Sequence, residues 1–151
     1  MANSEERKVP KLLNDRVDLR SLTIGVFHSS LTTLKNGELQ GVELDKDNEL
    51  IIFTNFGTIT GDLLDNIDEE EKDDSVKNAT FLHEVIMRAR NTSLDEYSNE
   101  GIVRLVNDSG AIPLANVTIT PYSNPNNPYN LSYFLLYPDQ VIGFTIGKRQ
   151  T

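Results

Sequence analysis

Residues 34–53 read Leu-Lys-Asn-Gly-Glu-Leu-Gln-Gly-Val-Glu-Leu-Asp-Lys-Asp-Asn-Glu-Leu-Ile-Ile-Phe and carry the clearest structural signal in the chain. The pair Asn36-Gly37 tolerates positive backbone φ angles and is a strong signal for a β-hairpin turn. Apolar residues alternate after it, which is the pattern of a strand with one buried face. The polar turn 45–48 then leads into the apolar run 50–53. The stretch therefore predicts two strands joined by short turns.

Similar patterns lie on both sides of this stretch. Leu22, Ile24 and Val26 alternate with smaller residues and predict an earlier strand, and residues 58–64 predict a later one. The last third repeats this character, with expected strands at 102–106, 114–119, 131–136 and 141–146. We therefore expect a mainly β protein with one or two helices, whose strands are bent by glycines into one or two small barrels.

A helix is expected between the two β-rich parts, from about residue 75 to 90. The acidic residues of 62–74 precede its N-terminus and should act as a solvated linker. Asn91 is a reasonable end for this helix. An apolar stripe at helical spacing should pack against the rest of the protein, and it consists of Phe81, Leu82, Val85, Ile86 and Ala89.

These patterns divide the chain into four segments, which make one or two small domains. They are a tail with a short helix (1–20), a first barrel-like β half (21–66), an acidic linker with a helix (67–99) and a second β half (100–148).

The composition of the chain excludes several classes of function. The chain has 151 residues, a formal net charge of −9 and no cysteine, which excludes disulfides and thiolate chemistry. Lysines and arginines never cluster beyond two adjacent residues, so RNA is a disfavoured partner. No apolar run is long enough to span a membrane and the N-terminus lacks a signal-peptide pattern, so we expect a cytoplasmic protein of a bacterium or phage with no membrane partner.

Motifs for catalysis, metals and cofactors do not emerge. His28 and His83 are the only histidines and do not form a zinc-binding pattern. The loop that starts at Asp45 lacks the glycine and the final acidic ligand of a calcium-binding loop. Gly57 and Gly61 are not followed by the Lys-Ser/Thr of a phosphate-binding loop and are read as a bend in a strand. We therefore expect a non-enzyme with no metal and no cofactor.

Residues 34–52 resemble the first conserved motif of the Sm-like family. The shared features are a leucine, a glycine-bearing turn, a second glycine in a bent strand, and an Asp and an Asn before an apolar strand. Residues 137–144 are similar to the closing strands of such a barrel. The resemblance implies a small barrel that assembles into rings. It would place Asp45 and Asn48 on the loop that lines the pore, where the Asn contacts a uridine base in RNA-binding members.

Three functions fit these observations. The first is a non-enzymatic Sm-like interaction or assembly module that forms a homo-oligomer and serves an unknown protein partner. The second is an RNA-binding ring of the Sm type that uses Asp45 and Asn48. The third is a small-molecule-binding or hydrolytic domain with a cleft of paired carboxylates.

Overall fold

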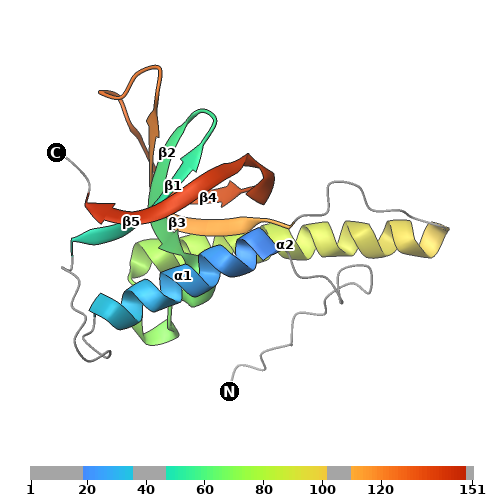
Figure 1. Cartoon of the computed structure of the whole chain (residues 1–151). Helices are drawn as coiled ribbons and strands as arrows, with labels where there is room; N and C mark the ends of the chain where they lie inside the picture. Colours follow the sequence, from blue (N-terminus) through green and yellow to red (C-terminus); the bar gives the residue numbers. More distant parts are fainter. Residues whose placement is uncertain (1–18, 36–46, 102–109, 149–151) are drawn as a thin grey trace.

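The computed structural model describes residues 19–35, 47–101 and 110–148 (Figure 1). Two long helices, five strands and three short 3₁₀ helices follow one another in these described residues. They are α1 (Leu19–Lys35), β1 (Asn48–Thr54), β2 (Gly57–Leu63), η2 (Leu64–Asn66), η3 (Glu69–Glu71), α2 (Asp74–Glu100), β3 (Ile112–Pro121), β4 (Tyr129–Leu136), η4 (Pro138–Gln140) and β5 (Val141–Lys148).

The strands form one antiparallel sheet in the order β4-β3-β2-β1-β5. β1 pairs with β5 from Asn48 opposite Lys148 to Thr54 opposite Val141, and β2 pairs with β3. Described strands from before and after α2 therefore share one sheet, and α2 is inserted between its second and third strands. The mainly β class with one or two helices is confirmed, and the sheet is open, with β4 and β5 at its edges.

Our prediction of a strand at Leu22–Val26 was wrong, because these residues lie within α1. Ile24 and Leu31 are buried and seven residues apart, which is two helical turns, whereas Leu22 and Val26 are exposed. The alternation was limited to five residues, and the longer helical period outweighs it. Thr23 and Ser30 also donate hydrogen bonds to carbonyl oxygens one turn earlier, an arrangement specific to helices.

The main core lies between α1 and the sheet. Its buried residues are all aliphatic, as expected for a chain without tryptophan. Phe27 of α1 meets Phe144 of β5 edge-to-face, with ring centroids 4.9 Å apart. The buried members are Ile24, Leu31, Leu50, Ile52, Ile59, Leu63, Ile112, Leu114, Val117, Ile119 and Leu136.

A smaller cluster joins α2 to the sheet through Leu64, Val76, Ala79 and Ala115. Successive side chains of a strand point to opposite faces, and Leu114 belongs to the α1 core while Ala115 belongs to the α2 cluster. The two helices therefore pack on opposite faces of β3. Figure 1 shows that the C-terminal half of α2 extends past the sheet.

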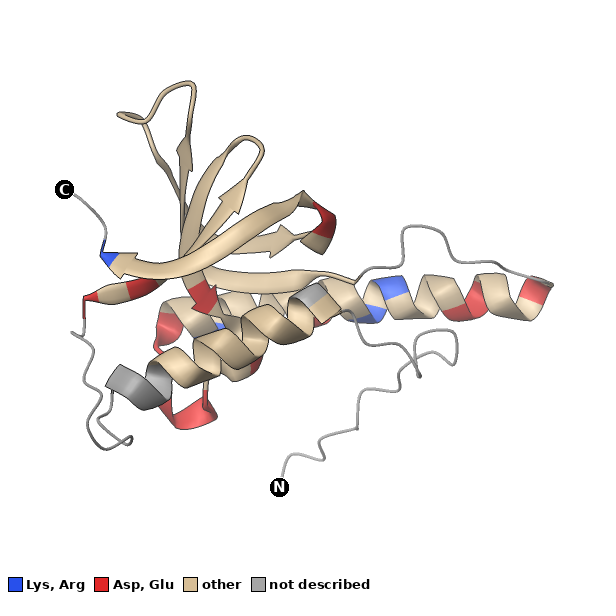
Figure 2. Ribbon diagram, viewed as in Figure 1, with Lys and Arg blue, Asp and Glu red and all other residues tan. Residues whose placement is uncertain are grey.

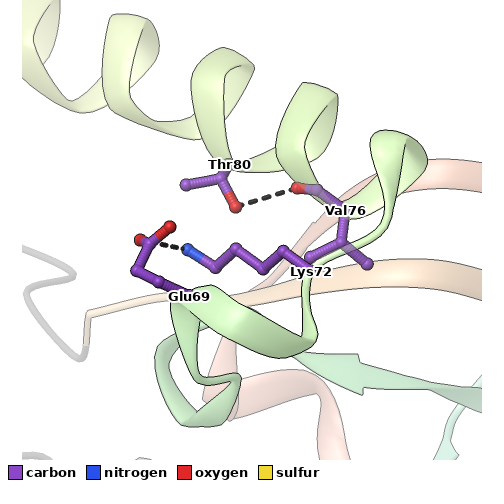
Figure 3. A network of polar contacts seen from close by, with 4 residues as sticks. All are labelled: Glu69, Lys72, Val76 and Thr80. Atoms are coloured by element: carbon purple, nitrogen blue, oxygen red, sulfur yellow. Dashed lines mark hydrogen bonds and ion pairs between the residues drawn. The ribbon is translucent and has the colours of Figure 1, made fainter.

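The acidic segment before α2 provides its N-terminal cap. The Asp73 carboxylate accepts a hydrogen bond of 2.8 Å from the backbone N–H of Val76, which satisfies a helix-end donor. Just before the cap, Lys72 forms a 2.7 Å ion pair with Glu69, and Thr80 bonds the carbonyl oxygen of Val76 (Figure 3). The segment predicted as a solvated linker thus contains η2 and η3 and ends as a helix cap.

α2 differs from its prediction in two ways. It continues through Asn91 to Glu100, and Asn91 is buried, with its side-chain oxygen accepting hydrogen bonds from Arg90. The predicted apolar stripe does not pack on the sheet, because Phe81, Leu82, Val85, Ile86 and Ala89 are all exposed. The opposite side of the helix is buried instead, with Val76, Ala79, His83, Met87 and Asn91.

The predicted bend at Gly61 matches a shift in the β2–β3 register between Thr60 and Asp62. Opposite it, Asn116 has a φ of 52°, a left-handed conformation that asparagine tolerates. Its side chain accepts a hydrogen bond from Ser75 and donates one to Asp62, which ties the start of α2 to this bulge. The predicted turn at 36–37 and the predicted strands at 38–44 and 102–106 lie outside the described residues.

The β1–β2 turn offers a test of this architecture. The hydroxyl of the fully buried Thr54 donates to the carbonyl oxygen of Gly57 at 2.7 Å and accepts from the N–H groups of Phe56 and Gly57. Thr54→Val keeps the shape but leaves these groups unpaired, so we expect a loss of about 1–3 kcal/mol in the free energy of unfolding. Urea denaturation measures it. Thr54→Ser keeps the hydroxyl and should stay close to the natural protein, whereas equal losses in both variants would contradict this role.

Candidate functional site

The two edge strands form the most unusual surface of the sheet. In the described part of the chain, β4 and β5 each have a single neighbouring strand. β4 contains neither a charged residue nor a proline, and β5 has only Lys148 at its end. Figure 2 shows that the acidic residues lie mostly on the segment before α2, on η4 and at the far end of α2. The edges therefore carry a single charge, at Lys148, in a protein of high net charge.

An apolar groove lies beside the β5 edge. It has a volume of about 490 Å³ and separates β5 from the start of α1. Ile142 is 66% exposed at this groove, and an added Cβ at Gly143 would meet no atom within 4 Å. The groove is lined by Leu19, Thr23, Ile24, Val141, Ile142, Gly143 and Phe144. A strand added alongside β5 could place its alternate side chains here, as in other β-augmented complexes.

A polar pair lies between α2 and β4. A 2.9 Å hydrogen bond links Nδ1 of the buried His83 and the hydroxyl of Tyr133. Burial raises the pKa of the Tyr133 phenol above its ordinary value, and the nearby Tyr137 raises it further. A tyrosine that holds its proton donates or accepts a neutral hydrogen bond. The pair therefore anchors α2 to β4.

The raised pKa can be measured directly. Folding stability that depends on protonated Tyr133 is fully present below pH 10 and is lost as the pH rises through the higher pKa of the folded state. In a spectrophotometric titration of the tyrosines, we expect Tyr133→Phe to remove a component that ionises above the ordinary range. The variant should also lose less stability in alkaline solution than the natural protein. Removal of a component in the ordinary range would contradict the assignment.

The structure does not bring the residues singled out by sequence into one site. Asp45 lies outside the described residues. Asn48 is the first residue of β1, half-buried, and lies opposite Lys148. His28 is on α1, where its Nδ1 lies 3.5 Å from the side-chain nitrogen of Asn66, whereas His83 is on α2. Within residues 19–35, 47–101 and 110–148, His, Asp and Glu form no group of three that could hold a metal ion.

The edge strands were missed as a site by sequence reasoning. Residues 129–136 and 141–147 are free of charge, but so is the interior strand β3, because residues 109–138 contain no charged side chain. Both segments gave correct strand predictions, but neither could be recognised as an edge without the strand order.

Comparisons of the chain with protein-family models, with curated proteins and with solved structures found no match. None of the helices in the described part of the chain is long and apolar enough to cross a membrane. The geometry of the sheet and its helices is therefore the basis for a functional proposal.

Proposed function

We propose that this chain is a non-enzymatic, Sm-like assembly module that self-associates by pairing the β4 edge of one copy with the β5 edge of the next. The observation that carries this proposal is that, among the described residues, neither edge is shielded. Proteins usually shield edge strands with charged side chains, prolines or a covering segment, because an open edge pairs with other strands. β4 and β5 are eight residues each, and Lys148 is the single charged residue in the two strands together.

The two edges are different surfaces, so their contact is head-to-tail. Such contacts close into a ring when the rotation between copies allows it. Each copy would donate one β4 edge and one β5 edge, and a closed ring leaves no edge open. The groove beside β5 adds an apolar contact to the backbone hydrogen bonds of the new strand pair.

Several features support the Sm-like resemblance. A helix precedes the five antiparallel strands, and an aliphatic core lies between this helix and the sheet. The register shifts at Phe53/Thr54 and Thr60/Asp62 bend the sheet, as the small barrel of the resemblance requires. The net charge of −9 and the nearly uncharged edges favour protein assembly over RNA as the role of such a ring.

Two edge-blocking variants test the proposal. Lysine on an edge strand opposes pairing. We expect Leu131→Lys in β4 and Ile142→Lys in β5 each to break the ring into smaller species, since each leaves only one usable edge per copy. Mixed together, the two variants should associate one to one, because the β5 edge of the first can still pair with the β4 edge of the second. Light scattering after size-exclusion chromatography measures both results.

Phe56→Lys is the matched control, since Phe56 is similarly exposed but lies in the β1–β2 turn. It should leave the assembly intact. A natural protein that is monomeric, or edge variants that keep the natural molar mass, would contradict the proposal. Far-UV circular dichroism confirms that each variant stays folded.

A further inference from the structure

α2 has two faces with different environments. The face against the sheet contains small and polar residues, including Ala79, His83 and Asn91. The other face carries the stripe Phe81, Leu82, Val85, Ile86 and Ala89, and Phe81 is 71% exposed. Contiguous apolar surface of this kind on a helix usually marks an interaction site. We call this set of five residues the outer stripe of α2.

Four charged residues are arranged symmetrically along one edge of the outer stripe, whereas the exposed Asp74 and Glu96 stand outside this pattern. At about 100° per residue, Lys77, Glu84, Arg88 and Asp95 fall within about 40° of one another around the helix axis. Their order is positive, negative, positive, negative. Lys77 and Asp95 are each nine residues from Ile86, and Glu84 and Arg88 are each two residues from it.

Four of the five apolar residues share this centre within half a residue, whereas the counterpart of Phe81 is Arg90. Leu82 and Ala89 are equally far from the midpoint between Val85 and Ile86. When two helices pack face to face and antiparallel around a two-fold axis, the same edge of each helix meets its counterpart. Each Lys77 would then lie level with Asp95 of the second copy, and each Glu84 level with its Arg88.

We propose that the outer stripe binds the outer stripe of a second copy of this chain, as an antiparallel helix pair centred at Val85–Ile86. The alternating charges along the edge of the stripe favour a second copy of this chain as the partner. Without this pairing of opposite charges, two chains of net charge −9 would repel each other. The pair buries the apolar stripe and brings opposite charges together on its edge. This contact uses a surface different from β4 and β5 and does not depend on their pairing.

Cysteine cross-linking tests the geometry, since the chain has no cysteine of its own. Val85→Cys lies near the two-fold axis, so two copies should join rapidly under mild oxidation. Asn78→Cys is on the same exposed face, but its copies would lie about 22 Å apart along the axis at about 1.5 Å per residue. Asn78→Cys alone should therefore not cross-link, whereas a mixture of Asn78→Cys with Ser93→Cys should.

Phe56→Cys, in the β1–β2 turn, measures random collision. Val85→Cys that cross-links no faster than Phe56→Cys would overturn the proposal, and rapid cross-linking of Asn78→Cys with itself would overturn the antiparallel arrangement. Repeating Val85→Cys together with Ile142→Lys separates this contact from edge pairing: cross-linking should persist even if the edge-paired assembly is absent.

A charge exchange provides a second readout. Lys77 and Asp95 are 18 residues apart, or about 27 Å along one helix, so they cannot pair within one copy. In an Ile142→Lys background, Lys77→Glu and Asp95→Lys should each weaken dimerisation roughly 5- to 10-fold, because each reversal affects two symmetric pairs. The double variant should recover most of the loss in sedimentation equilibrium. Additive losses in the double variant would contradict the pairing.

Discussion

An open β-sheet leaves one row of backbone N–H and C=O groups on each edge strand, and these groups need water or another strand as a partner. In this protein the two rows belong to β4 and β5, whose side chains offer almost no charge to keep other strands away. The apolar groove beside β5 adds a place for side chains of an incoming strand. Backbone pairing between copies would satisfy both rows at once, which is why we propose the edges as the functional surface.

α2 gives the same protein a second kind of surface. Its sheet-facing side approaches β3 closely, because Ala79 packs near Ala115, and the buried His83 is satisfied by the hydroxyl of Tyr133. This side also buries Val76 and Met87. The outer stripe of the same helix leaves larger apolar residues such as Phe81 exposed. Figure 1 shows α2 as a long helix beside the sheet. Strand edges and helix stripe together would let one chain join neighbours in two directions.

Local patterns predicted much of the fold. The apolar run at 50–53, the strand at 114–119 and the beginning of the helix near residue 75 follow from side-chain period and flanking residues, and the structure contains each of them. The strand predicted at 22–26 failed because five residues cannot distinguish alternation from a helical face. The outer stripe was expected to pack against the rest of the chain. This prediction failed because the apolar character of a helix face does not reveal what packs against it. The edge strands could not be identified without the order of the strands in the sheet. That order depends on pairing between segments that are far apart in the sequence.

The molar mass of the natural protein in sedimentation velocity tests the central claim most directly. Head-to-tail pairing of β4 with β5 closes only in a ring, and the helix contact alone joins two chains. We predict a species of three or more chains of 16.9 kDa that keeps its mass on dilution. A monomer, or a dimer that dissociates on dilution with no larger species, would contradict it.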